Sequence, residues 1–257
     1  MKDLLTVAKD AALKAGKLLR DNVSGTREIS YKGEINLVTE MDRLSEKTVV
    51  ETLLAAFPGH GILAEEGGRI ENSSGYIWII DPLDGTTNYA HGYPNFAVSI
   101  GLEKDGEIVL GVVYDPLRDE LFSAQKGQGA FLNNRPICVS GHDTLIRSLL
   151  ATGFPYDRAT SEKNNLNYFK ALLMASQEVR RSGSASLDLC SVASGRLDGY
   201  WELKLHPWDV AAGSLIVTEA GGKVSDFSGV NFSIHDKEIV ASNGKIHELM
   251  IEVLGKA

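Results

Sequence analysis

Residues 78–89 read WIIDPLDGTTNY, and this stretch constrains the fold more than any other in the chain. A short apolar run of this kind is typical of a strand that a sheet buries. The run ends in Asp81 and Asp84, which a Gly-Thr-Thr segment follows at once. Two carboxylates this close raise each other's pKa unless a cation lies between them. The stretch therefore predicts a buried sheet with a charged site at the end of one strand.

Each aspartate also has a purely structural interpretation. Asp84 could be the N-cap of a helix that starts at Gly85, and Asp81 could be a turn residue before Pro82. Taken together at the end of an apolar strand, the two carboxylates favour a functional site.

The ligand types in the chain narrow the choice of cation. The six histidines are scattered, and the two cysteines, Cys138 and Cys190, are far apart, so neither a zinc site nor a disulfide framework is indicated. Carboxylates combined with carbonyl and hydroxyl oxygens suit a hard ion such as Mg²⁺. If the Gly-Thr-Thr segment starts a helix, its backbone N–H groups attract an anion as well. A carboxylate-held cation beside an anion site indicates metal-assisted phosphoryl chemistry.

The spacing of the two aspartates separates two mechanisms of that chemistry. Haloacid-dehalogenase-like phosphatases carry the pattern DxDGT, in which the first aspartate is a covalent nucleophile. This chain carries DxxDGT, with Pro82 and Leu83 between the aspartates. The longer spacing favours two aspartates that hold metal while a water attacks.

Charge and hydropathy indicate where the chain works and what it binds. A formal charge of −8 disfavours a nucleic-acid backbone as the main partner. The N-terminal stretch carries too many charges for a signal peptide, and no apolar run approaches membrane-spanning length. Together with the sparse cysteines, these features predict a cytoplasmic protein without a membrane partner.

Hydrophobic periodicity divides the chain into two halves. In residues 1–140 we expect two helices, a polar loop between them, and a largely antiparallel sheet. The helices are expected at 3–22 and 39–57, the loop at 24–34, and the strands at 61–64, 77–80, 96–103, 107–114, 119–125 and 129–132. In residues 141–257, short strands alternate with helices, as in an α/β unit. These strands are expected at 148–152, 178–181, 199–203 and 238–241, and the helices at 162–176, 184–195 and 209–220.

Several ordered motifs resemble those of the inositol monophosphatase family of Mg²⁺-dependent, lithium-sensitive phosphatases. The motifs are GILAEEGG at 61–68, WIIDPLDGTTNYAHGYPNFAVSIGL at 78–102, GVVYDPLRDELFSAQKGQGAFLN at 111–133 and WELKLHPWDVAAGSLIVTEAGG at 201–222. The resemblance covers nearly the whole chain. It implies a layered αβαβα sandwich of the sugar-phosphatase type, of mixed α+β and α/β character, with the site between the two halves.

Matched residue by residue, the resemblance implies a role for most polar residues of these motifs. The family's metal-ligating positions match Glu65, Asp81, Asp84, Asp209 and the backbone carbonyl of Leu83. The catalytic group that positions or deprotonates the attacking water matches Thr86 and Asp42, with Glu65 beside them. Substrate-binding positions match Gly85, Thr87, Gly183, Ser184, Ala185 and Glu202, and a lysine on a mobile loop matches Lys32.

Without the resemblance, several of these residues have structural interpretations. Asp209 could be the N-cap of the last predicted helix, and Asp42 could belong to the capping box of the second. Glu202 could be a solvated strand residue and Thr86 a helix cap. His206 is interpreted as structural.

The resemblance implies hydrolysis of a small phosphate monoester by a homodimer with two, and at a weaker site a third, Mg²⁺ per active site. One Mg²⁺ would lower the pKa of the attacking water and another would stabilise the leaving alkoxide. Asn36 stands where the family often has aspartate, which bears on the third ion.

The substrate favoured by the resemblance is myo-inositol 1-phosphate, because Glu202 precedes Asp209 by seven residues, as in inositol-phosphate members. Fructose 1,6-bisphosphate, adenosine 3′,5′-bisphosphate and histidinol phosphate remain alternatives. A non-catalytic binding or regulatory protein is the alternative from another class.

Overall fold

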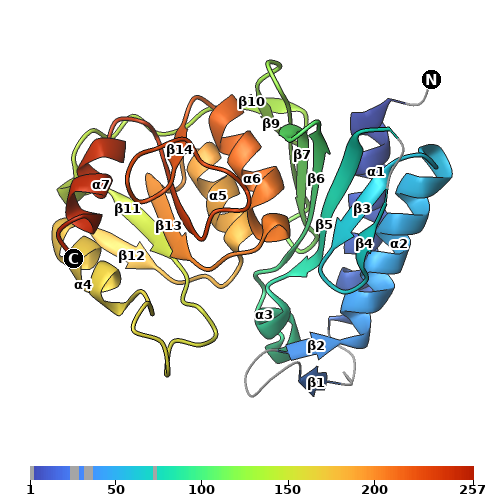
Figure 1. Ribbon diagram of the computed structural model, residues 1–257, viewed down its shortest axis with the longest axis horizontal. Coiled ribbons are helices and arrows are strands. Elements are labelled where there is room, and N and C mark those ends of the chain that lie inside the picture. The colour runs from blue at the N-terminus through green and yellow to red at the C-terminus, as the bar shows by residue number, and fades with distance from the viewer. Residues whose placement is uncertain (1–2, 24–28, 32–36, 72–73) are drawn as a thin grey trace.

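The computed structural model describes residues 3–23, 29–31, 37–71 and 74–257. Its described helices and strands form five layers in the order helices, sheet, helices, sheet, helices (Figure 1). The αβαβα sandwich expected from the sequence is confirmed. None of the described helices combines the length and hydropathy that crossing a bilayer requires.

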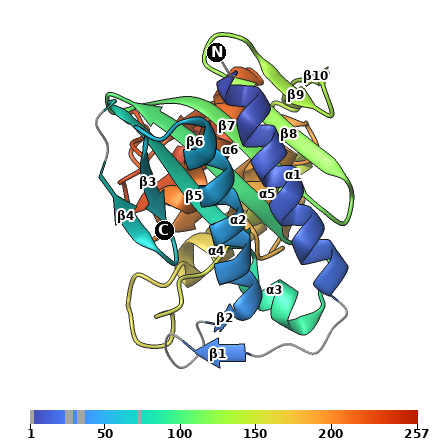
Figure 2. The same ribbon diagram turned by 90° about the vertical axis from the view of Figure 1, so that its right-hand side faces the viewer.

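The first outer layer consists of α1 (Leu4–Asn22) and α2 (Glu40–Ala56). Both helices lie across one face of the larger sheet (Figure 2). α1 starts where the Asp3 carboxylate accepts a hydrogen bond from the backbone N–H of Thr6, at 2.9 Å. Its alanine-rich face, which includes Ala8 and Ala15, is fully buried. Small side chains on that face let the helix lie close to the sheet.

The larger sheet has eight strands in the order β10-β9-β8-β7-β6-β5-β3-β4. β3 and β5 run parallel, and every other neighbouring pair is antiparallel. The strands are β3 (Gly61–Ala64), β4 (Gly68–Ile70), β5 (Tyr76–Asp84), β6 (Ala97–Lys104), β7 (Glu107–Asp115), β8 (Glu120–Gln125), β9 (Ala130–Leu132) and β10 (Arg135–Ile137). The short helix α3 (Thr86–His91) follows β5 directly.

The middle layer consists of α5 (Ala185–Ala193) and α6 (Pro207–Glu219). Most of their side chains are buried, because sheets cover them on both sides. One continuous apolar core joins these helices to strands of both sheets, for example Ile79 and Val113 to Leu189 and Tyr200. The two halves of the chain therefore share a core.

The smaller sheet has five strands in the order β12-β11-β13-β15-β14. β11 is parallel to both β12 and β13, whereas β15 is antiparallel to its neighbours. The strands are β11 (Leu149–Thr152), β12 (Glu178–Arg180), β13 (Gly199–Leu203), β14 (Lys223–Ser225) and β15 (Glu238–Ser242). The outer layer consists of α4 (Leu166–Ala175) and α7 (His247–Leu254), and the 3-10 turn η1 (Leu145–Arg147) precedes β11.

The structure adds elements that the sequence did not predict. β1 (Ile29–Tyr31) and β2 (Leu37–Thr39) pair antiparallel, and β1 lies where only a loop was expected. β4, β10, β14 and α7 were also missed. Four of these strands and β2 have three residues each, which is too short for an alternating pattern to stand out. The division of the chain at residue 140 remains a prediction.

Candidate active site

A β-bulge at the end of β5 directs Asp81 and Asp84 to the same side of the sheet. Asp81 pairs with Ser99 of β6, and Asp84 pairs with Ala97, so three steps on β5 match two on β6. In a regular strand, residues three apart face opposite sides. The extra residue in the bulge corrects this offset. The DxxDGT spacing is therefore the spacing that places both carboxylates together on a bulged strand.

The polar backbone groups of the bulge have nearby partners. Pro82 has no N–H, and the N–H of Leu83 donates to Asp81 Oδ1 at 3.0 Å. Ser45 of α2 donates to the Pro82 carbonyl at 2.7 Å. The Leu83 carbonyl lies 3.0 Å from Thr86 Oγ1. These contacts fix the bulge without a regular ladder.

The turn after β5 requires glycine. Gly85 has φ 96° and is the residue before α3, so Asp84 is not the N-cap and that alternative is wrong. A Cβ on Gly85 would lie 2.9 Å from the Asn95 carbonyl oxygen. Thr86 is the first residue of α3, and its Oγ1 lies 3.0 Å from Asp42 Oδ1 of α2. Asp42 is almost fully buried, in the first turn of its own helix.

Four carboxylates from three parts of the fold influence one another at this strand end. Asp81 and Asp84 come from β5, Glu65 follows the parallel strand β3, and Asp209 lies in the first turn of α6. Burial raises the pKa of Asp81 well above its ordinary value. The charges of the other three carboxylates raise it further. Among the described residues, the hydrogen bond from the Leu83 N–H opposes these effects.

Serines of the second half of the chain hold Asp84. Its Oδ2 accepts hydrogen bonds from Ser184 Oγ at 2.6 Å, from the N–H of Ser186 at 2.7 Å and from Ser186 Oγ at 2.5 Å. Burial raises the pKa of Asp84, and these hydrogen bonds counteract part of the rise. Ser184 is also the N-cap of α5. The start of α5 therefore fixes a carboxylate of the other half.

Asp209 occupies the third position of α6. The helix begins at Pro207 with His206 as its N-cap, so the interpretation of Asp209 as the N-cap is wrong. Asp209 Oδ2 accepts from the N–H of His206 at 2.6 Å as part of a capping box. Burial raises the pKa of Asp209 well above its ordinary value. The structural role expected for His206 agrees with its place in the cap.

A cavity of about 870 Å³ brings most of the predicted site residues together. The predicted residues that line it are Glu65, Leu83, Asp84, Gly85, Thr86, Thr87, Gly183, Ser184, Ala185, Glu202 and Asp209. Asp81 and Asp42 do not line it: they are buried behind Asp84 and Thr86 and act on them through charge and a hydrogen bond. Lys32 and Asn36 lie outside the described residues.

The donor set fits a hard divalent cation. It consists of carboxylate oxygens with the Leu83 carbonyl and the Thr86 hydroxyl beside them, and its negative charges raise one another's pKa. Within the described part of the chain, no three His, Cys, Asp or Glu side chains already converge closely enough to chelate an ion. Oδ2 of Asp84 and Oδ2 of Asp209 accept hydrogen bonds, and each carboxylate has a second oxygen that can coordinate a cation.

Glu202 of β13 is buried, at 9% exposure, so its interpretation as a solvated strand residue is wrong. The Tyr200 hydroxyl donates to Glu202 Oε2 at 2.5 Å. Burial raises the pKa of Glu202 to about 7, although the Tyr200 hydrogen bond and then the charge of Arg181 oppose the rise. Glu202 therefore changes its charge near neutral pH.

Sequence reasoning missed several residues around the cavity. Ser186 was missed although the segment RSGSAS, just before a predicted helix, is rich in capping residues. Tyr156, Gly153 and Asp188 also line the cavity. No local pattern marks these three, because long-range folding brings them there.

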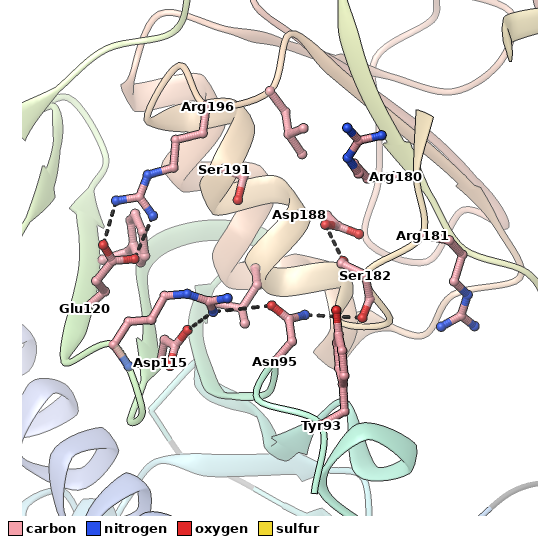
Figure 3. A pocket seen from close by; sticks show the side chains of 14 residues that line it. Tyr93, Asn95, Asp115, Glu120, Arg180, Arg181, Ser182, Asp188, Ser191 and Arg196 are labelled. Carbon is pink, nitrogen blue, oxygen red and sulfur yellow. Dashed lines mark hydrogen bonds and ion pairs between the residues drawn. The ribbon is translucent and has the colours of Figure 1, made fainter. Parts of the chain in front are cut away.

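A second cavity of about 360 Å³ shares Arg181 and Asp188 with the first. Figure 3 shows a hydrogen-bonded chain along it, from Asp115 through Arg118 and Asn95 to Ser182. Ser182 Oγ in turn donates to Asp188 at 2.5 Å. This chain holds the segment that continues into Gly183 and the serines around Asp84.

Comparison with known proteins identifies the family of this chain. The pattern of the inositol monophosphatase family matches residues 1–257. An inositol-1-monophosphatase of Synechocystis sp. is 47% identical over 252 residues, which cover 97% of this chain and 88% of the relative. The Nus factor SuhB of Pseudomonas aeruginosa is 45% identical over 261 residues, which cover 99% of this chain and 96% of the relative.

Solved structures of similar proteins share the fold of this chain. The inositol monophosphatase of Anabaena (Nostoc) sp. superposes with a TM-score of 0.91 at 47% identity and covers 98% of this chain and 95% of its own. The extragenic suppressor protein suhB of Bartonella henselae has a TM-score of 0.94 at 42% identity, with 99% of each chain covered.

The fold and the carboxylate-lined cavity are those of a phosphoric monoester hydrolase. The chain belongs to the inositol monophosphatase family.

Proposed function

We propose that this enzyme hydrolyses small phosphate monoesters with Mg²⁺, and that myo-inositol 1-phosphate is its preferred substrate. The observation that carries the proposal is the set of four mutually repelling carboxylates beside the Thr86–Asp42 pair. Such a set is costly to bury without a cation, and Mg²⁺ prefers oxygen donors of this kind. The names of similar enzymes support the substrate.

Glu65, Asp81, Asp84, Asp209 and the Leu83 carbonyl would hold two Mg²⁺, with a third at a weaker position. When bound, Mg²⁺ supplies Lewis-acid activation of the attacking water and charge stabilisation at the leaving oxygen. Asp81 is buried beside the cavity wall, so it contributes charge close to the ions and supports Asp84.

Thr86 and Asp42 would orient and deprotonate the attacking water. The Thr86 hydroxyl has a single proton and lies 3.0 Å from both Asp42 Oδ1 and the Leu83 carbonyl oxygen. When it donates to Asp42, the Leu83 carbonyl is left open for a cation, and a lone pair of Oγ1 can accept from water. Asp42 would then accept the Thr86 proton while Thr86 Oγ1 takes a proton from the water.

The phosphate would bind at the start of α3, where the backbone N–H groups near Gly85 and Thr87 are available, and at the turn Gly183–Ala185. Glu202 would accept hydrogen bonds from substrate hydroxyls. Hydroxyl-rich substrates gain from this contact, whereas a plain aryl phosphate does not.

Phosphate release from myo-inositol 1-phosphate, fructose 1,6-bisphosphate, adenosine 3′,5′-bisphosphate and histidinol phosphate tests the proposal. Each substrate is assayed with Mg²⁺, with EDTA and with added Li⁺. We expect Mg²⁺-dependent, Li⁺-inhibited turnover that is fastest with the inositol ester. Equal turnover in EDTA would refute the metal-dependent mechanism. Faster turnover of another ester would show that myo-inositol 1-phosphate is not the preferred substrate.

A second role as a binding or regulatory protein has support from the relatives named Nus factor SuhB. The catalytic positions matched in the described chain all carry competent side chains, so we place such a role beside catalysis. If the purified protein retains a stoichiometric partner and shows no phosphatase activity, binding or regulation would be its main function. We further propose a cytoplasmic homodimer, which sedimentation of the purified chain and fractionation of cells would test.

A further inference from the structure

The carboxylate of Glu202 occupies space that any residue with a side chain at position 153 would take. Gly153 follows β11 directly, and Glu202 lies on β13, the parallel neighbour of β11. A Cβ on Gly153 would lie 2.1 Å from Glu202 Oε1 and 2.3 Å from Oε2. Both distances are far below van der Waals contact. The missing side chain is therefore what lets Glu202 reach the cavity.

A buried asparagine holds the Gly153 peptide in this position. Asn165 Nδ2 donates to the Gly153 carbonyl at 2.5 Å and to Thr152 Oγ1 at 2.8 Å. Its Oδ1 accepts from Trp201 Nε1 at 2.8 Å, and Asn165 is only 1% exposed. Thr152 Oγ1 also donates to the Trp201 carbonyl at 2.6 Å. The network ties the end of β11 to the residue just before Glu202.

We propose that Gly153 and Asn165 are positioning residues that place the Glu202 carboxylate in the cavity and so determine the preference for hydroxyl-bearing phosphate esters. The inference rests on the proposed function for the role of Glu202. The position of Glu202 then depends on two features outside the metal-binding residues: the absence of a side chain at Gly153 and the hydrogen bonds of Asn165.

The geometry makes Gly153→Ala a selective probe. Gly153 is not among the residues with positive φ, so alanine fits its backbone. The atoms that a new Cβ meets belong to the far end of the Glu202 side chain, which can rotate away. Because Oε2 already accepts from Tyr200, displacement breaks that hydrogen bond and removes Oε1 from the cavity. The fold should survive while the hydroxyl contact is lost.

The test compares myo-inositol 1-phosphate with p-nitrophenyl phosphate, which has no hydroxyl group. A hydrogen bond to a charged acceptor corresponds to about a ten- to hundredfold change. We expect Gly153→Ala to lower kcat/KM for the inositol ester by that factor, mainly through KM, with little change for the aryl ester. Gly141→Ala is the matched control, because its Cβ would meet only Lys245 Nζ, at 3.9 Å.

A double-mutant cycle asks whether the effect passes through Glu202. In a Glu202→Ala background the space is free, so Gly153→Ala should cause no further loss. Asn165→Asp keeps the shape but removes both donors, and should shift the substrate ratio in the same direction. An equal loss for both esters, or an undiminished Gly153→Ala effect in the Glu202→Ala background, would overturn the proposal.

A crystal structure of Gly153→Ala provides a readout that does not depend on activity. We expect the Glu202 carboxylate to have left Tyr200. A carboxylate that stays in place would refute the proposal even in an active enzyme. If the wild-type enzyme hydrolyses neither ester, the proposed function fails, and this structure alone decides the positioning role.

Discussion

Buried negative charge is compensated differently in two walls of the cavity. The strand-end wall, residues 81–87, includes Asp81, whose pKa is raised by burial and by three other carboxylates. Among the described residues, one backbone hydrogen bond lowers it. The Glu202 wall, formed by Glu202 and Gly153, has a tyrosine hydrogen bond and the charge of Arg181 to support its carboxylate. The described neighbours of Asp81 supply no compensating cation, whereas Tyr200 and Arg181 offset part of the cost of burying Glu202. This difference supports the proposal that the strand-end wall binds metal and that the Glu202 wall recognises substrate hydroxyls.

Asp81→Asn is expected to have the largest effect, with opposite signs for activity and stability. Removing the charge should lower kcat/KM by at least about 10³-fold, because metal binding is weakened. In EDTA the free energy of unfolding should rise by about 1 kcal/mol or more, because a repelled, buried charge is gone. Urea unfolding and Mg²⁺ titration measure both.

The matched control for this variant is Asp10→Asn, which removes an exposed carboxylate that pairs with Lys14 on α1. It should change neither quantity measurably. If Asp81→Asn is inactive but binds Mg²⁺ like the wild type, the covalent-nucleophile alternative gains support.

Thr86→Ala tests whether the strand-end wall also activates water. Loss of the hydroxyl should lower kcat by about 10²- to 10³-fold and leave KM nearly unchanged, since Thr86 would act on water and not on substrate. Thr86→Ser retains the hydroxyl and should recover most of the rate. Equal losses in the two variants would argue for a purely structural role.

Glu202→Gln should reveal how the free-energy cost of burying the Glu202 carboxylate depends on pH. The pKa of Glu202 rises from 4.5 to about 7 on folding, so Glu202 stays protonated to a higher pH in the folded protein than in the unfolded chain. The stability of the wild type relative to the variant should then fall as pH rises from 4.5 to 7, by up to about 3 kcal/mol. Urea unfolding in EDTA at pH 5 and pH 8 measures it. A difference that is constant with pH would mean that Glu202 titrates normally.

His247→Gln provides a pH effect of opposite sign, away from both walls. His247 on α7 is fully buried between Ser225 and Ser242, at 2.8 Å and 2.9 Å, and its pKa falls from 6.5 to about 4, mainly through burial. The unfolded chain therefore takes up a proton first as pH falls. Wild-type stability should decrease from pH 6.5 to pH 4 by about 2 kcal/mol relative to the variant. Parallel curves for the two proteins would contradict this assignment.

Local patterns predicted the main helices and strands well, because long amphipathic or apolar segments express their periodicity directly. α1 and α2 begin and end within about a residue of their expected limits. The expected helix at 162–176 instead begins at Leu166, after Asn165. Asn165 has φ 73° and its side chain bonds to Gly153, so long-range contacts set this start.

The site was predictable where sequence spacing reflects backbone geometry. The bulge brings Asp81 and Asp84 to one side, and most of the residues matched by the resemblance line the cavity. What it did not give is the support around them, such as Ser186 behind Asp84 or Gly153 beside Glu202. Those contacts join residues far apart in the chain, and only the packed fold brings them together.

The bulge at the end of β5 also makes the placement of the two aspartates depend on how the strands pair. Because Asp81 and Asp84 are three residues apart and share a side only through the bulge, regular pairing of residues 81–84 with β6 would turn one of them to the other face. A β5–β6 pair that formed without the bulge would make this error during folding. Correct strand pairing and an assembled site are therefore a single event, and a misregistered chain would be inert rather than partly active.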